Sequence, residues 1–208
     1  MKKVIFKLNE FQKIVISMPT QIYNLFRYDE VSITFFNFDQ KIRIFENDFA
    51  IVAFRILRAK LDNALNGKLN LHTSIGNDIG YLWMKNLYGK SKKLIYEYSN
   101  EGQRLWVGLR YLLWSTTSGN PESWLYEKNG KFILEITPTY RLPTIKEKKS
   151  GNYLTYRQFL KKYKPLLVTS ISKETAKRWL KKTEKILEII EGNDSKYFIN
   201  KTPNNNTK

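Results

Sequence analysis

The alternation of apolar and polar positions near the start of the chain predicts four β-strands. Two short apolar runs, at residues 4–8 and 13–17, come first. Residues 31–38 then alternate between two faces, and a turn at Asp39-Gln40 leads into the run 41–45. Alternation that is rich in β-branched and aromatic residues is typical of half-buried strands joined in hairpins. We therefore expect an antiparallel sheet in this part of the chain.

After residue 47 the apolar spacing changes to a helical period. Three- and four-residue steps separate the apolar residues Ile51, Phe54, Leu57, Leu61 and Leu65. Asn47 or Asp48 is expected to cap this helix, because Asn and Asp accept hydrogen bonds from the first free N–H groups. Asn66-Gly67 supplies a stop. The pattern predicts a long helix packed on the sheet.

Residues 68–103 fit more than one structure. The segment 79–88 suits either a short helix or a strand, whereas 94–98 predicts a strand that ends at a turn over 99–102. Residues 105–114 are rich in β-formers and predict a further strand.

The clearest local pattern is a hairpin centred on Asn129-Gly130. Asn-Gly accepts the positive φ angles of a two-residue type I′ turn, so the flanking runs should pair. That register places Leu125 opposite Leu134 and Tyr126 opposite Ile133. One face, expected to belong to the core, then carries Leu125, Phe132, Leu134 and Ile136, and the other carries Trp124, Tyr126, Ile133 and Glu135.

The C-terminal part reads as helical. Prolines and a polar run mark residues 144–153 as a linker between an α+β domain, 1–143, and a helical segment, 154–192. One helix, 156–163, should end at Pro165, and a second should run from Ser172 to Gly192. The tail 193–208 is polar and is expected to be disordered. We predict an α+β fold with a largely antiparallel sheet, a long packed helix and a basic C-terminal helical part.

Composition adds a strong positive charge. The chain has 36 Lys and Arg against 19 Asp and Glu, for a net charge of +17. Such a surface attracts polyanions, anionic membranes or acidic proteins, although a merely lysine-rich, solvated surface would look the same. The chain has no cysteine, which excludes disulfides and thiolate chemistry. Since no apolar run has the length of a membrane span, we expect a soluble, cytoplasmic protein without a membrane partner.

Catalytic patterns are sparse. His72 is the single histidine, and the chain contains neither a nucleophile elbow nor a phosphate-binding glycine loop. Four carboxylates lie on or near predicted strands, where a magnesium-dependent nuclease could use them, but their spacing favours solvated strand faces: Glu97, Glu122, Glu127 and Glu135. We expect no enzyme activity, no catalytic residue, no metal site and no cofactor.

The charge is concentrated near the C-terminus. Residues 144–185 hold thirteen cations and three carboxylates, and Lys177, Lys181 and Lys185 stack at the unfavourable four-residue spacing of like charges. An anionic partner would relieve this repulsion. The predicted partner-binding set is Lys161, Lys162, Lys164, Lys177, Arg178, Lys181, Lys182 and Lys185, with the aromatic residues Trp124 and Tyr126.

One segment carries a resemblance to a known group. Residues 122–126 (Glu-Ser-Trp-Leu-Tyr), then Asn129-Gly130, then residues 133–138 with Tyr140 resemble a W-L-Y…N-G…E-I-T-P-x-Y hairpin of bacterial immunity proteins from contact-dependent and polymorphic toxin systems. The resemblance spans about 20 residues. It implies a non-catalytic protein that binds and blocks a cognate toxin domain, and it transfers no functional residue, because such families contact toxins through variable surfaces.

Two functions therefore stay open. The first is an immunity, or antitoxin-like, protein with an acidic protein partner, the cognate toxin domain. The alternative is a nucleic-acid-binding protein that uses the basic C-terminal helices. One difficulty faces the first: a nuclease toxin usually presents a basic active site, which calls for an acidic inhibitor.

Overall fold

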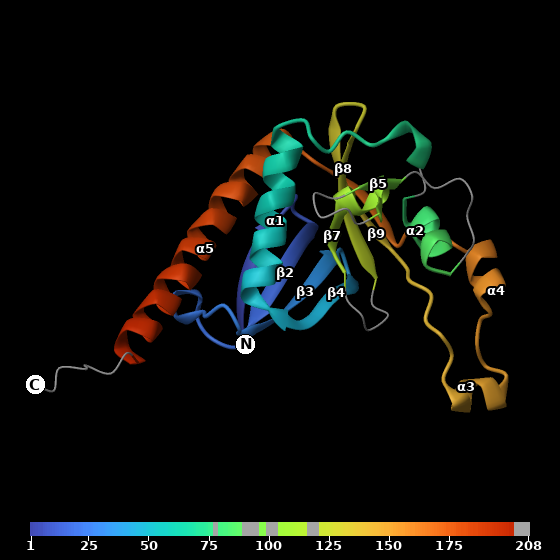
Figure 1. The fold of residues 1–208 in the computed structure, drawn as a ribbon, viewed down its shortest axis with the longest axis horizontal. Helices are drawn as coiled ribbons and strands as arrows, with labels where there is room; N and C mark the ends of the chain where they lie inside the picture. Colours follow the sequence, from blue (N-terminus) through green and yellow to red (C-terminus); the bar gives the residue numbers. More distant parts are fainter. Residues whose placement is uncertain (77–78, 89–95, 99–103, 116–120, 202–208) are drawn as a thin grey trace, which may run out of the picture.

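The computed structural model describes residues 1–76, 79–88, 96–98, 104–115 and 121–201. Two four-stranded antiparallel sheets lie with two long helices around a common apolar core, and shorter elements lie to one side (Figure 1). The expected α+β fold is confirmed.

The first sheet is a meander of four antiparallel strands. In order they are β1 (Lys2–Lys7), β2 (Gln12–Met18), β3 (Glu30–Asn37) and β4 (Gln40–Phe49). Because Asn37 pairs with Gln40, the last turn lies one residue earlier than expected. The inner face is buried, as alternation predicts, and the outer face is turned away from the core.

Helix α1 (Ala50–Leu65) packs on the inner face of this sheet. Its predicted caps, Asn47 and Asp48, are wrong, because β4 extends to Phe49, which takes the N-cap position without a side-chain hydrogen bond. The stop is confirmed: Asn66 is the C-cap, and Gly67 has a φ of 68°.

The segment between α1 and the hairpin is built from short elements. A 3₁₀ turn, η2 (Thr73–Ile75), precedes α2 (Ile79–Tyr88), so the helical alternative is confirmed for residues 79–88. Of the strand expected at 94–98, the structure describes β5 (Tyr96–Tyr98), and the turn at 99–102 lies outside the described residues.

The single strand expected over 105–114 is wrong in its middle. Two short strands, β6 (Arg104–Trp106) and β7 (Leu112–Trp114), enclose a 3₁₀ helix, η3 (Val107–Tyr111). The backbone at Gly108 folds against the Trp106 ring, and a Cβ atom there would lie 2.3 Å from that ring. Only glycine fits this approach, and the strand is interrupted as a result.

The predicted hairpin is confirmed in position and register. Strands β8 (Glu122–Lys128) and β9 (Lys131–Thr137) pair with Leu125 opposite Leu134, and the turn residues Asn129 and Gly130 have φ angles of 50° and 71°. Sequence reasoning missed β10 (Leu167–Ile171), which extends the second sheet to the order β10-β9-β8-β7. This edge strand is only five residues long and half exposed, so its apolar pattern is weak.

The expected linker contains a helix, α3 (Ile145–Ser150), which Thr144 and Glu147 close with a capping box. Helix α4 (Tyr156–Lys161) follows as predicted. The stop at Gly192 and the disorder beyond it are wrong, since α5 (Lys173–Lys201) continues through residues 193–201. Contacts of Asn193 and Asp194 with the segment before β3 hold this extension in place. Residues 202–208 lie outside the described ranges.

Helix α5 packs along α1 and also covers the edge of β1 (Figure 1). Ser172 caps it, as predicted. The carbonyl of Lys7 accepts hydrogen bonds from Trp179 Nε1 at 3.1 Å and from Arg178 at 3.3 Å, and the carbonyl of Ile5 accepts one from Lys182 Nζ at 2.8 Å. These side chains occupy backbone groups that an edge strand otherwise leaves free.

Candidate interaction surfaces

The structure separates the predicted C-terminal cations into two groups. Lys161, Lys162 and Lys164 belong to α4 and the residues after it, whereas the remaining five cations lie on α5. Figure 1 places α4 and α5 on opposite sides of the molecule. The basic run in the sequence is therefore not one continuous patch.

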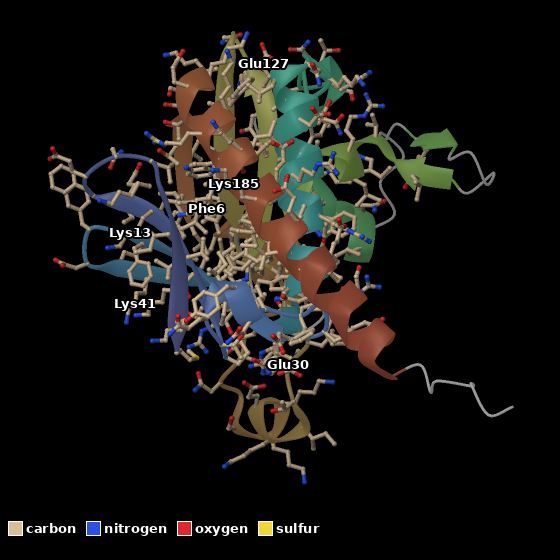
Figure 2. All side chains as sticks on the ribbon, turned by 90° about the vertical axis from the view of Figure 1, so that its left-hand side faces the viewer. Phe6, Lys13, Glu30, Lys41, Glu127 and Lys185 are labelled. Carbon is tan, nitrogen blue, oxygen red and sulfur yellow. The ribbon has the colours of Figure 1, made fainter. Side chains whose placement is uncertain are left out.

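Two of the α5 cations already have partners within the chain. Arg178 and Lys182 donate to β1, and the Lys182 ammonium lies 5.3 Å from the centre of the Phe6 ring. Burial lowers the pKa of Lys182. Lys177, Lys181 and Lys185 are exposed, and Figure 2 shows Lys185 on α5.

The two aromatic members of the predicted set are wrong as surface residues. Trp124 and Tyr126 are buried, because both faces of the β8–β9 hairpin are covered. Trp124 Nε1 donates to Thr137 Oγ1 at 2.8 Å, and the Tyr126 hydroxyl donates to Glu135 at 2.7 Å. Of the residues that carry the immunity-protein resemblance, these two aromatic ones thus belong to the scaffold, whereas the turn residues Asn129 and Gly130 are exposed.

Two of the four carboxylates are also placed differently from the expectation. Glu122 and Glu135 are buried, not solvated. Burial raises the pKa of Glu122 to about 7, while a hydrogen bond from Ser115 at 3.0 Å opposes the rise. The indole N–H of Trp83 also opposes it, although its geometry falls short of a hydrogen bond. Glu127 is half-buried beside a pocket, and Glu97 belongs to β5.

His72 has a structural role at the start of η2. The His72 ring accepts a hydrogen bond from the Ser74 amide at 3.2 Å and so caps η2. Within the described ranges, no three His, Asp or Glu side chains gather as metal ligands.

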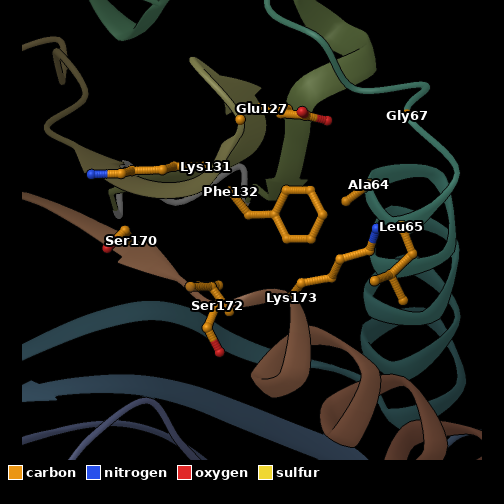
Figure 3. A pocket seen from close by; sticks show the side chains of 11 residues that line it. Ala64, Leu65, Gly67, Glu127, Lys131, Phe132, Ser170, Ser172 and Lys173 are labelled. Carbon is orange, nitrogen blue, oxygen red and sulfur yellow. The ribbon is translucent and has the colours of Figure 1, made fainter.

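One pocket, of about 450 Å³, lies where the hairpin turn, the end of α1, β10 and the start of α5 meet. Figure 3 shows the Phe132 ring in its middle, with Lys173 reaching toward α1 and Lys131 pointing away. Glu127 borders the pocket from β8. The pocket offers an apolar floor, one carboxylate and two lysines, of which Lys131 points away, and none of its lining residues belongs to the predicted partner-binding set.

A cluster of exposed aromatic side chains lies at one end of the first sheet. These four residues, here named the aromatic end, are Tyr23, Phe26, Tyr28 and Phe49. Their exposed fractions are 58%, 38%, 64% and 42%, respectively. Tyr28 and Phe49 meet edge to face with ring centres 5.3 Å apart. Exposed aromatic clusters of this kind usually mark a contact surface.

The aromatic end is anchored to both long helices. Asn193 of α5 donates to the carbonyls of Tyr23 and Leu25 at 2.9 and 3.0 Å. Asp194, which is buried, pairs with Arg27 at 2.5 Å. The first amide of α1 donates to the carbonyl of Asp29 at 2.8 Å. The segment is therefore held in one arrangement before any partner arrives.

The local charge of the aromatic end is opposite to that of the whole chain. Residues 23–30 and 46–49 contain one cation, Arg27, and four carboxylates: Asp29, Glu30, Glu46 and Asp48. Arg27 is paired with Asp194 and Glu46 with Arg43, so the negative charge of this end rests on Asp29, Glu30 and Asp48. This end is acidic within a protein of net charge +17.

The other end of the same sheet carries a row of lysines, with the carboxylates Glu10 and Asp39 in the two turns beside it. The strand register aligns Lys7, Lys13, Phe36 and Lys41 side by side across all four strands, and these residues are named the lysine row. Figure 2 shows Lys13 and Lys41 well apart from Glu30, which marks the aromatic end. Lys13 and Lys41 each lie 5.6 Å from the centre of the Phe36 ring.

Two exposed phenylalanines lie beside the lysine row. Phe11 and Phe38, the phenylalanine pair, stack with ring centres 4.6 Å apart and are 54% and 66% exposed. Phe38 has a φ of 50°, a conformation that bulky residues rarely adopt. Its amide donates to the Phe11 carbonyl at 3.1 Å, which ties the two turns together.

Sequence reasoning missed both surfaces, because each joins residues from separate segments. A signal for the aromatic end was present in residues 22–28, where aromatic residues occur without strand alternation. The lysine row follows from the strand register, which needs the correct turn between β3 and β4.

Within the part of the chain that the structure describes, no helix combines the length and apolar character that a membrane crossing requires. Comparison of the chain with protein-family models, with curated proteins and with solved structures finds no match.

Proposed function

We propose that this protein is a non-catalytic immunity, or antitoxin-like, protein that neutralises a cognate bacterial toxin in the cytoplasm by direct binding. The aromatic end carries this proposal. Tyrosine and other aromatic residues dominate the binding energy of protein interfaces when they enter pockets of a partner. Here they are exposed, and α5 fixes the segment that carries Tyr23, Phe26 and Tyr28, so ordering this segment on binding costs little further free energy.

The resemblance of the β8–β9 hairpin supports the same function in a limited way. Its aromatic and aliphatic residues are largely buried, and its exposed residues, Asn129 and Gly130, form the turn, so the resemblance concerns a scaffold. Recognition of the toxin would then depend on a surface outside the hairpin, in keeping with the variable surfaces of such proteins.

The acidic character of the aromatic end addresses the difficulty raised by the net charge. A basic toxin surface, such as that of a nuclease, is repelled by most of this protein but not by the carboxylates around Tyr28 and Phe49. We propose that basic side chains of the toxin face Glu30 and Asp48. The net charge predicts an acidic protein partner, and this stays a prediction for the surface outside the aromatic end.

Growth rescue tests the proposal. The toxin domain encoded beside this gene is expressed in a susceptible strain with the wild-type protein, with the double variant Tyr28→Ala/Phe49→Ala, or with Lys161→Gln/Lys162→Gln as a control. Wild type and control should restore growth. The aromatic variant should fail, with a Kd about 30-fold higher or more, because interface anchors contribute at least ~2 kcal/mol.

Two results would contradict this function. One is a toxin that kills equally well with and without the wild-type protein. The other is a gene neighbourhood that contains no toxin. The alternative, nucleic-acid binding through the C-terminal helices, stays a prediction, and it has lost support because α4 and α5 lie apart and two α5 cations bond to β1.

A further inference from the structure

The lysine row is a straight line of cations on an open sheet face. Lys7 pairs with Lys13, Lys13 with Phe36, and Phe36 with Lys41, so one line crosses four strands over roughly 14 Å. Arg178 of α5 continues the line, since its guanidinium donates to the carbonyl of Lys7.

This arrangement costs free energy in the isolated protein. Like charges directly opposite each other on neighbouring strands repel, and Lys7 and Lys13 are such a pair. Among the ion pairs of the described residues, none includes Lys7, Lys13 or Lys41. The Phe36 ring offers a partial compensation, by cation–π contact with two of the three ammonium groups.

The phenylalanine pair adds a second unfavourable feature at the same end of the sheet. Phe11 and Phe38 expose more than half of their surface, and the Phe38 backbone has a positive φ. The two-residue turn of Phe38 and Asp39 itself demands a positive φ, but glycine or asparagine would adopt it with less strain, so an exposed phenylalanine at this position points to a binding role. Gln12 lies between Phe11 and Lys13, and Asn37 lies between Phe36 and Phe38. The Gln12 side chain donates a hydrogen bond to Asn37 Oδ1 at 3.0 Å, which connects the phenylalanine pair to the lysine row.

We propose that the lysine row and the phenylalanine pair form a binding site for single-stranded nucleic acid, with phosphates along the lysines and a base against the exposed phenylalanine rings. A linear run of cations follows a phosphate backbone, and aromatic faces stack on bases without reading their sequence. In a duplex the base faces are stacked on one another, so its phosphates can contact the lysines but its bases cannot stack on the phenylalanine rings. This site is independent of the aromatic end and of the proposed toxin binding.

The experiment measures fluorescence anisotropy of a labelled oligothymidylate of about twelve nucleotides, within the usual site size of such surfaces. The wild-type protein should bind it and prefer it to a duplex of equal length and to poly-L-glutamate. Affinity should fall with salt with a logarithmic slope near −2, as expected when three lysines neutralise phosphates of a single strand at about −0.7 each.

Charge variants locate the site. Lys13→Gln/Lys41→Gln should weaken binding at least tenfold and reduce the salt slope by about 1.4. Lys161→Gln/Lys162→Gln removes the same charge from α4, outside the row, and should change affinity less than about twofold if the row is the site. Equal losses in both variants would overturn the proposal, because they would show attraction by net charge alone.

Phe38→Asn tests the rings separately from folding. Asparagine accepts a positive φ, so relief of strain should offset the lost ring contact and leave the melting temperature nearly unchanged. The variant should nevertheless bind the oligothymidylate between about 5-fold and 100-fold more weakly. Unchanged affinity, absent binding by the wild type, or equal binding of duplex or poly-L-glutamate would each reject a single-strand site.

Discussion

The aromatic end and the lysine row occupy the two ends of one four-stranded sheet, about 20 Å apart along β3. The first presents tyrosine and phenylalanine among carboxylates, and the second presents lysine beside stacked phenylalanine. Their anchoring also differs. Helix α5 holds the aromatic end through long-range contacts, whereas the phenylalanine pair is held by the two turns that carry it. The net charge of +17 describes neither surface, because the residues near each one set its local charge.

Ionic strength should separate the two surfaces most strongly. Raising salt from about 50 mM to about 200 mM should weaken oligothymidylate binding by roughly 20-fold, because bound phosphates release their counterions. Toxin binding at the aromatic end relies on apolar burial and should change only a few-fold. The measurement is a salt titration of each Kd, and equal salt dependence would mean that the two surfaces do not differ in kind.

Removal of the α5 anchor should affect only the aromatic end. Asp194→Ala breaks the buried partner of Arg27, so the segment at residues 23–28 loses part of its fixed arrangement. We expect toxin affinity to fall about tenfold, through the cost of ordering this segment again on binding, with oligothymidylate affinity unchanged.

Glu191→Ala is the matched control for this anchor. Glu191 lies on α5, like Asp194, and forms an exposed ion pair with Arg55 of α1. An exposed pair contributes little to the free energy of unfolding. If Glu191→Ala weakens toxin binding as much as Asp194→Ala does, the anchoring role of Asp194 is wrong.

The buried carboxylate of Glu122 should make the stability of the whole fold depend on pH without changing either surface. Because Glu122 has a folded pKa near 7, above its unfolded value of 4.5, the folded protein binds more protons between these values. The free energy of unfolding should therefore fall as pH rises from about 4.5 through 7. Glu122→Gln should remove this dependence and raise stability at pH 8 by about 1–3 kcal/mol, as followed by denaturant unfolding.

Both binding activities should stay within about twofold of wild type in Glu122→Gln at low denaturant, since a change in the core leaves both surfaces intact. Stability that rises with pH across this window would contradict the buried, protonated state of Glu122.

Local chemistry explains which elements could be predicted. Asn129-Gly130 fixes a turn type, and the turn fixes the register of β8 and β9, so that hairpin followed from two residues. The close packing of the Gly108 backbone against the Trp106 ring has no sequence pattern, so the strand predicted over this segment is wrong. Gly192 would end a helix by itself, but contacts made by Asn193 and Asp194 override that tendency.

The candidate surfaces were harder to predict than the elements. The basic C-terminal run was visible, but the fold directs Arg178 and Lys182 to the β1 edge and sets α4 apart from α5. The aromatic end joins residues 23–28 with Phe49, and a residue near the end of α5 fixes it. Surfaces of this kind depend on tertiary contacts over long sequence separations, which propensity does not contain.

The bonds from α5 to the edge of β1 have a consequence during synthesis. Trp179 and Lys182 reach carbonyls that were made 172 and 177 residues earlier. At about 5–20 residues per second, the ribosome exposes this strand for roughly 10 to 35 seconds before its cover exists. Throughout that interval the free edge of β1 can pair with strands of neighbouring chains. The yield of folded protein should therefore depend on chaperones that cover this edge and on how quickly α5 is synthesised.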